Sequence, residues 1–213
     1  MEEASVKVAR YFGTVVGHRD YMTSHHARRV GMISYVLTDT VRKLFPEFGI
    51  GDHEVRMISS AATLHDAGKI GLPDRVILKP TKLNNQEYEI YKSHTYKGKK
   101  MFDNVTRMIK ENDPDRAFFE MAGTICLEHH ERYDGKGYPE GLKGDEISLA
   151  AQIVGLADSY DDCMSDKMSK KKMSKLEVYD RIVNGDYGEF SPELLYVFKE
   201  CRQQLEQLLM KES

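Results

Sequence analysis

The chain has 213 residues, of which 40% are apolar and 31% charged, with no tryptophan, as expected for a single soluble, mainly helical domain over residues 1–213. The net charge of −3 argues against a general nucleic-acid or membrane-surface binder, so an anionic substrate needs a local site. Three scattered cysteines, no stretch that could span a bilayer and an N-terminus without signal-peptide features indicate a cytoplasmic protein.

Two amphipathic helices are expected at the start of the chain. Apolar residues at helical spacing predict a short N-terminal helix within residues 1–21. A longer helix should begin at residues 23–24, which supply an N-cap, and end before Pro46, because proline cannot continue a helix. His26 lies one turn before Val30, the first residue of the apolar stripe of this helix, and on the same face.

The third predicted helix carries a histidine and an aspartate side by side. Val55, Ile58, Ala62 and His65 recur at helical spacing, so His65 is expected on a buried face with Asp66 beside it. A buried carboxylate is costly unless a cation or several donors neutralise it, and a bound metal would satisfy both residues. The alternative is a core histidine capped by a local carboxylate.

Two further helices are expected to carry histidines. Asn84 opens a capping signature, and the helix that it starts contains His94. Residues 113–114, an aspartate and a proline, can start another helix. Its apolar residues run at helical spacing into His129 and His130, so another buried stripe ends in histidine.

The last third of the chain combines a loop with three helices. The glycine-rich stretch 131–144 is expected to be an ordered loop. Ser148 can cap the helix that carries Asp158, and a capping box at residues 174–177 opens a short helix. The apolar edge of the final helix, over residues 191–213, is expected to pack in the core, with the seam of a homodimer as the alternative.

Five of the eight histidines lie at or beside the apolar side of a predicted helix, where chance would place few of them. Imidazoles and carboxylates that converge from several helices build metal sites inside bundles. Five imidazoles with Asp66 and Asp158 are too many donors for one tetrahedral zinc but suit two octahedral ions that share a carboxylate. Two such ions, roughly 3.5 to 4 Å apart, can share a water, lower its pKa and direct the hydroxide at a phosphorus atom.

The order of these residues forms a series of motifs. They are His26-x-x-Arg29, His65-Asp66-x-Gly68-Lys69, His94-x-x-x-Gly98, His129-His130-Glu131 followed by Gly137-Tyr138-Pro139, and Asp158-x-Tyr160-Asp161. Together they resemble the HD-GYP domain, a branch of the HD phosphohydrolase superfamily, over residues 22–198. The resemblance implies an all-α fold, an HD-domain helical bundle with a binuclear metal centre in its core and a Gly-rich GYP loop.

The resemblance also implies an activity. Members of the family are phosphodiesterases that use a metal-activated hydroxide to open the bacterial second messenger cyclic di-GMP to pGpG, and often on to GMP. The implied cofactors are two divalent metal ions, iron or manganese, with zinc and nickel as alternatives because the same donors accept all of them. Diguanylate cyclase (GGDEF) domains are the implied partners of the GYP loop.

Carried over by position, the resemblance implies seven metal ligands. They are Asp66 as the bridging ligand, His26, His65 and Asp158 on one ion, and His94, His129 and His130 on the other. Some members hold a third ion with a glutamate one turn before the first histidine. That position is Met22 here, which cannot supply an oxygen ligand, so two ions are expected.

Five side chains are candidates for catalysis or substrate binding. Asp66 and Lys69 are the catalytic candidates, because Lys69 lies one turn after the motif histidine and could donate to a phosphate oxygen. The alternative for Lys69 is a solvated lysine near a helix C-terminus. Tyr138 offers a flat face to a guanine, or only folds the loop back. Lys167 and Lys170 stand where the family usually has arginines, so the bidentate grip on phosphate is lost.

Two other functions stay open. A non-hydrolytic module that binds cyclic dinucleotides or docks onto proteins would keep the fold, and the altered segment 167–170 favours it. An HD phosphohydrolase for another nucleotide would keep the metals but not the substrate. Turnover of cyclic di-GMP beside cyclic GMP-AMP separates these alternatives.

Overall fold

Every regular element is helical in the computed structural model, which describes residues 24–165 and 173–211. The α-helices are α2 (Ser24–Leu44), α3 (Asp52–Ala62), α4 (Asp74–Ile77), α5 (Asn85–Lys92), α6 (His94–Met108), α7 (Asp115–Glu128), α8 (Leu149–Ser165), α9 (Lys175–Val183), α10 (Pro192–Glu200) and α11 (Arg202–Lys211). Three short 3-10 helices are η1 (Pro46–Phe48), η2 (Ala67–Gly71) and η3 (Gly144–Glu146). The predicted all-α class is confirmed for this part of the chain, and the helix expected within residues 1–21 lies outside it.

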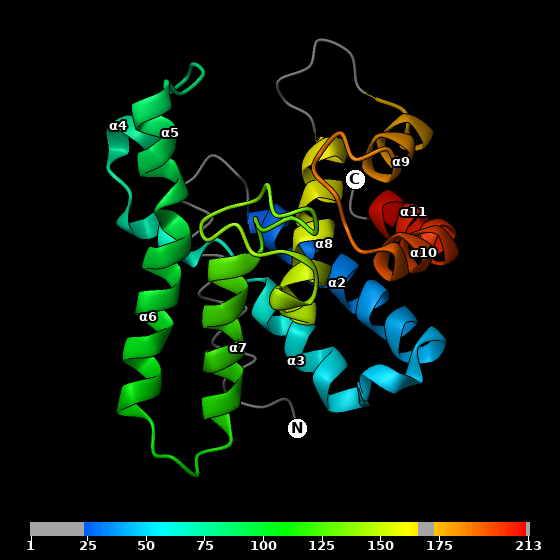
Figure 1. Ribbon diagram of the computed structural model, residues 1–213, viewed down its shortest axis with the longest axis horizontal. Coiled ribbons are helices and arrows are strands. Elements are labelled where there is room, and N and C mark those ends of the chain that lie inside the picture. Colours follow the sequence, from blue (N-terminus) through cyan, green and yellow to red (C-terminus); the bar gives the residue numbers. More distant parts are fainter. Residues whose placement is uncertain (1–23, 166–172, 212–213) are drawn as a thin grey trace.

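Helix α2 lies at the centre of the right half of the molecule (Figure 1). It contacts α3 and α8, and α10 and α11 pack against it. Helices α6 and α7 form an antiparallel pair on the other side, with α4 and α5 at the upper end of that pair (Figure 1). Because α7 contacts α3 and α8 as well as α6, it joins the two sides of the molecule. None of the helices described is long and apolar enough to cross a bilayer.

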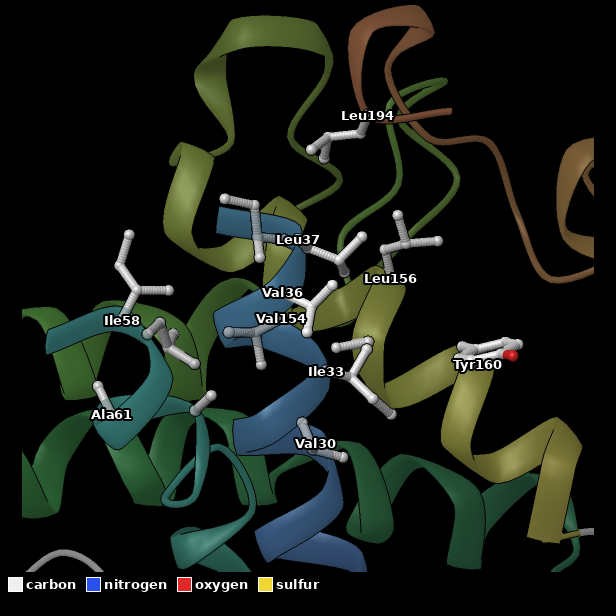
Figure 2. Close-up of a cluster of buried hydrophobic side chains, with 14 of the residues drawn as sticks. Val30, Ile33, Val36, Leu37, Ile58, Ala61, Val154, Leu156, Tyr160 and Leu194 are labelled. Atoms are coloured by element: carbon white, nitrogen blue, oxygen red, sulfur yellow. The ribbon is translucent and has the colours of Figure 1, made fainter. Parts of the chain in front are cut away.

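The apolar stripe of α2 organises the core. Val30 and Ile33 are fully buried, and Figure 2 shows them among side chains from α3 and α8, such as Ile58 and Leu156. Burial of this stripe removes a large apolar area from water and is the main favourable term in the fold. Since the stripe begins one turn after His26, packing α2 into the core also carries that histidine into the interior.

Four of the predicted capping residues start their helices, whereas the cap expected at residue 113 was wrong, because α7 begins at Asp115 with Pro114 as its N-cap and no side-chain cap bond. The side chains of Asn84, Ser174 and Ser191 each accept a hydrogen bond from the backbone N–H three residues later. The hydroxyl of Ser148 accepts in the same way at the start of α8, over 3.3 Å. Each bond satisfies one of the N–H groups that a helix leaves without an internal partner.

The third helix is shorter than predicted, which changes the setting of the His-Asp pair. Helix α3 ends at Ala62, so the expectation that His65 and Asp66 sit on this helix was wrong. After Ala62 the backbone hydrogen bonds join residues three apart, as in a 3-10 helix. The His65 backbone N–H, for example, donates to the Ala62 carbonyl over 3.3 Å. The tighter turn brings Gly68 against the backbone of α6, so the pair projects from a packed turn.

Two other predicted helices are broken into pairs. The helix expected from residue 84 breaks at Ser93, whose hydroxyl and backbone N–H both donate to the Ile90 carbonyl, over 2.5 and 3.1 Å. This bonding ends α5, and α6 then begins with a histidine as its first residue. The last helix breaks at Cys201 into α10 and α11. Its apolar edge, including Leu205, is buried within the chain and belongs to the core.

Candidate metal centre

The structure brings all seven predicted ligands into one cluster. His26 comes from α2, His65 and Asp66 from the turn after α3, His94 from the start of α6, His129 and His130 from the end of α7, and Asp158 from α8. Within the described residues, these seven fall into overlapping groups whose ligand atoms lie within 4.8 Å of one another. Five segments far apart in the sequence therefore supply one site, which is how helical bundles build metal centres.

Asp66 lies between two sets of histidines. Its Oδ1 is 3.4 Å from His94 Nε2 and 3.9 Å from His129 Nε2. Its Oδ2 is 3.2 Å from His65 Nε2 and 2.7 Å from the Lys69 ammonium. One carboxylate thus faces histidines on both sides, which is the position of a bridging ligand.

Asp158 is the second carboxylate of the cluster. Its Oδ1 lies 3.2 Å from His26 Nε2 and 3.4 Å from His65 Nε2. Burial opposes its charge, but the close contacts with the two histidines, in their protonated form, hold its pKa well below the usual range. Burial also lowers the pKa of His26, but the contact with Asp158 and the hydrogen bond to Asp161 outweigh this effect and raise it to about 9. A cation on the Nε2 of His26 must therefore displace a proton.

Each of four histidine rings is oriented through its Nδ1 atom. The Nδ1–H groups of His65, His94 and His129 donate to backbone carbonyls of the preceding turn, over 2.8, 2.7 and 2.9 Å. His26 donates its Nδ1–H to Asp161 Oδ2 over 2.8 Å. With the proton on Nδ1, the neutral ring keeps a free electron pair on Nε2. Histidines that bind metals are commonly held by such a bond on the other ring nitrogen.

The electron pairs in the centre of the cluster lack donors. In the described part of the chain, the atoms that are buried there without a hydrogen bond are the Nε2 atoms of His26, His65, His94 and His129 and the Oδ1 of Asp66. A buried polar atom without a partner is costly, and natural proteins rarely keep several together. Imidazole nitrogens and carboxylate oxygens are the donors that divalent transition metals prefer. The residues therefore fit a metal centre, and the alternative of an ordinary core histidine does not account for them.

Burial and neighbouring charge set the protonation of the cluster. Burial lowers the pKa of His129 to about 3, and the neighbouring histidines add to the shift. Burial also lowers the pKa of His94 and His130. Burial would raise the pKa of Asp66, but Lys69 and the nearby histidines hold it well below its usual range. At neutral pH these three imidazoles are therefore uncharged and Asp66 is ionised, the forms that bind metal ions. Burial lowers the pKa of His65 too, but the charge of Asp66 and contacts with Asp66 and Asp158 outweigh this effect and raise it well above its usual value, so His65, like His26, exchanges a proton for a metal ion.

The glycine-rich loop 131–144 is ordered, as predicted, and it covers one side of the cluster. The buried carboxylate of Glu131 accepts hydrogen bonds from three backbone N–H groups in residues 140–142, over 2.7 to 3.1 Å. The Tyr138 ring lies nearly parallel to that of His130, with centroids 4.6 Å apart and planes at 28°. The backbone N–H of Tyr138 also donates to the His130 carbonyl over 3.2 Å. Glu131 therefore fixes the loop that places Tyr138 beside the cluster.

Lys69 points into the site. Only 4% of its surface is exposed, so the alternative of a solvated lysine was wrong. The ammonium contacts Asp66 and lies 5.4 Å from the centroid of the Tyr91 ring. A buried ammonium beside the candidate bridging ligand adds positive charge where a phosphate oxygen would lie, so its predicted catalytic role stays a prediction with a suitable geometry.

Asp161 and Arg29 belong to the sequence motifs, but the sequence alone assigns neither of them a role. The Arg29 guanidinium donates through Nε and Nη2 to the two carboxylate oxygens of Asp161, over 2.5 and 2.8 Å. The fully buried Asp161 in turn accepts from His26 Nδ1. The signal in the sequence was the three-residue spacing of Asp158 and Asp161, which places both on one face of a helix.

We expect Asp161→Asn to weaken metal binding about 10- to 100-fold, because an amide cannot hold both the imidazole N–H and the guanidinium as a carboxylate does. The measurement is the metal affinity in competition with a chelator of known strength. Asp180→Asn on the exposed face of α9 is the matched control and should keep the affinity of the wild type. Equal affinity in both variants would contradict a role for Asp161 in holding His26.

Three residues singled out in the sequence lie outside the described residues. They are Met22, at the position of a possible third-ion ligand, and Lys167 and Lys170, the candidate phosphate contacts after α8. The candidate metal ligands and Tyr138 all lie within the described part.

Comparisons with known proteins agree with this geometry. A sequence model described as "HD domain" matches residues 8–193. The chain is 33% identical over 212 residues to a cyclic di-GMP phosphodiesterase of Thermotoga maritima, covering 100% of this chain and 53% of that protein. It is 28% identical over 200 residues to the 3'3'-cGAMP-specific phosphodiesterase 2 of Vibrio cholerae, covering 94% of this chain and 35% of that protein. The chain thus spans about half or less of these two relatives.

A solved structure has the same fold. The crystal structure of a cyclic GMP-AMP-specific phosphodiesterase of V. cholerae superimposes with a TM-score of 0.66 at 15% sequence identity. The match covers 98% of this chain and 50% of that one. The helical arrangement described above is therefore shared with a protein of known structure.

Proposed function

The chain belongs to the HD domain family, and on this basis we propose that it is a metal-dependent phosphodiesterase that hydrolyses a cyclic dinucleotide, with cyclic di-GMP as the first candidate substrate. The resemblance drawn from the sequence motifs is confirmed by the family match and the relatives. The observation that carries the proposal is the buried cluster in which four imidazole Nε2 atoms and the Oδ1 of Asp66 make no hydrogen bonds. Relatives named for cyclic di-GMP and 3'3'-cGAMP support the substrate class.

Two divalent ions suit the donor set better than one. Asp66 belongs to two groups of ligand atoms, one with His94, His129 and His130 and the other with His26 and His65. A carboxylate shared by two groups supports a pair of ions on either side of it, and mixed nitrogen and oxygen donors are compatible with iron or manganese. When bound, such a pair supplies charge for the phosphate oxygens and lowers the pKa of a water that the ions share.

The chain's own contribution is to orient the ligands and to add charge. Asp161 and three backbone carbonyls fix the histidine rings, so the Nε2 atoms face one point before any ligand arrives. Lys69 holds its ammonium next to Asp66 in a buried setting, where an electrostatic contact with a phosphate oxygen is stronger than in water. We therefore assign Lys69 the role of donor to a non-bridging phosphate oxygen.

A cavity of about 320 Å³ adjoins the cluster and gives a substrate room beside it. It is lined by His130 and Asp158 on the side of the cluster and by Arg132 and Tyr187 farther out. A phosphodiester that enters the cavity thus reaches the candidate ligands directly. This placement supports a substrate larger than a single phosphate group.

The test is hydrolysis by the protein loaded with Fe²⁺ or Mn²⁺, with products identified by chromatography. We expect cyclic di-GMP to be opened to pGpG, and 3'3'-cGAMP is included because some relatives are named for it. Preference for 3'3'-cGAMP or for a linear phosphodiester would instead assign the chain to another nucleotide. A metal-loaded protein that binds cyclic di-GMP but never cleaves it would identify a binding module. Docking of a GGDEF domain on loop 131–144 and formation of a homodimer stay predictions.

A further inference from the structure

Helix α5 and the glycine-rich loop place a group of tyrosines beside the metal centre. Tyr88 is nearly parallel to Tyr91, with centroids 6.4 Å apart and planes at 10°, and it meets Tyr138 edge to face at 6.3 Å. Tyr138 lies against His130, and the Tyr91 centroid is 5.1 Å from that of His94. The aromatic contacts therefore run from the surface at Tyr88 to two of the candidate metal ligands.

A lysine joins the two outer rings. The Lys92 ammonium lies 5.5 Å from the centroid of Tyr88 and 5.7 Å from that of Tyr138. It also pairs with Glu89 at 2.7 Å, and a quarter of the Lys92 side chain is exposed. Cation–π contacts of this kind hold the ammonium between the rings while leaving part of it open to solvent.

Packing does not explain this group. Helix α5 buries none of its residues, and 46% of the Tyr88 surface is exposed. A helix with no fully buried residue gains little stability from the core, and exposed aromatic rings that lie together commonly mark a binding surface. Aromatic faces stack on nucleobases, and an ammonium binds phosphate.

We propose that Tyr88 and Lys92, together with Tyr138, form a subsite for the purine base and the second phosphate of a substrate whose first phosphate lies at the metal centre. The inference rests on the proposed function and deepens it, because it says which part of the chain distinguishes a dinucleotide from a simple phosphodiester. In a cyclic dinucleotide both phosphates belong to one sugar–phosphate ring, and both bases are attached to the sugars of that ring. A phosphate at the cluster therefore keeps a base and the other phosphate within reach of α5.

The test compares two substrates in the metal-loaded protein. Cyclic di-GMP has purines and a second phosphate, whereas bis(p-nitrophenyl) phosphate has neither. We expect Tyr88→Ala and Lys92→Met each to raise KM for cyclic di-GMP about tenfold, as expected for loss of one stacked base or one phosphate contact. For bis(p-nitrophenyl) phosphate, kcat/KM should stay within about twofold of the wild type, because the metal centre is untouched.

Matched variants separate substrate contact from a structural role. Tyr88→Phe keeps the ring and should restore the wild-type KM for cyclic di-GMP. Tyr196 is another half-exposed tyrosine, on α10 at the opposite side of the molecule (Figure 1). Tyr196→Ala should change neither KM for cyclic di-GMP nor kcat/KM for bis(p-nitrophenyl) phosphate. Lys100→Met on the exposed face of α6 serves as the control for Lys92.

Two results would overturn the subsite. One is an unchanged KM for cyclic di-GMP in Tyr88→Ala and Lys92→Met, and the other is an equal loss with both substrates, which would place the effect at the metal centre. If the wild type cleaves neither substrate, the proposed phosphodiesterase fails, and the subsite is then decided by calorimetric binding of cyclic di-GMP. Weaker binding by Tyr88→Ala than by the wild type would support the subsite, whereas equal affinity or no binding by the wild type would remove it.

Discussion

Asp66→Ala is expected to abolish the metal centre and with it the hydrolysis of cyclic dinucleotides. The carboxylate faces histidines on both sides, at 3.4 Å from His94 Nε2 and 3.2 Å from His65 Nε2. Without it the two halves of the ligand set have no shared oxygen. We expect about two ions per chain in the wild type and fewer than one in the variant, with turnover at least about a hundredfold lower. Elemental analysis of natively purified protein, beside product formation, measures both.

Two further variants separate the loss of a metal ligand from other causes of metal loss. Removing the carboxylate leaves the buried Lys69 ammonium beside a gap, so loss of metal could arise from repulsion or misfolding. The double change Asp66→Ala with Lys69→Met removes that charge and should still lack metal. Asp180→Ala on exposed α9 should keep both ions. If Asp66→Ala retained two ions while folded, as judged by its circular dichroism, Asp66 would not be the bridging ligand.

The convergence of the candidate ligands could be predicted because each of them belongs to a pattern that one sequence displays. His26 and His65 extend apolar stripes at helical spacing, and burial of a stripe carries such residues inside. His129 follows from the same rule on α7. A histidine on an apolar face is unusual, because that face is buried when the protein folds. Several such histidines are therefore expected to meet in the interior.

The local backbone could not be predicted in the same way. The break at Ser93 depends on a hydroxyl bond to the Ile90 carbonyl, and nothing in the apolar spacing signals it. The tight turn after α3 depends on contact between Gly68 and α6, which is a tertiary interaction. Periodicity reports which face is buried, whereas helix ends are decided by such contacts.

The exposed group on α5 escaped prediction for a different reason. Tyr88 and Lys92 lie on no apolar stripe and in no motif, because their meaning comes from the loop that packs against them. Arg29 and Asp161 were visible in motifs, but their pairing joins α2 to α8 across 132 positions of sequence. Residues that act through a distant partner become interpretable only once the fold sets them side by side.

Gly68→Ala is expected to destabilise the protein by about 3 kcal/mol or more and to disturb the metal centre at the same time. A Cβ at Gly68 would lie 1.9 Å from the His94 carbonyl oxygen and 2.4 Å from the Gly98 backbone nitrogen. Both obstacles are backbone atoms of α6, so no side chain can rotate away to make room. The turn must move off the helix, and the turn holds Asp66 while the helix begins with His94.

The matched control lies three residues away, in the same 3-10 helix. A Cβ at Gly71 would meet only the aliphatic stem of Lys97, at 3.0 Å, and a flexible exposed lysine can shift. We expect Gly71→Ala to stay within about 1 kcal/mol of the wild type in urea unfolding, while Gly68→Ala unfolds at clearly lower urea and binds less metal. Because both substitutions have the same intrinsic effect on the unfolded chain, the difference isolates the contact with α6. Unfolding of the two variants at the same urea concentration would mean that the close approach of Gly68 does not hold the His-Asp turn against α6.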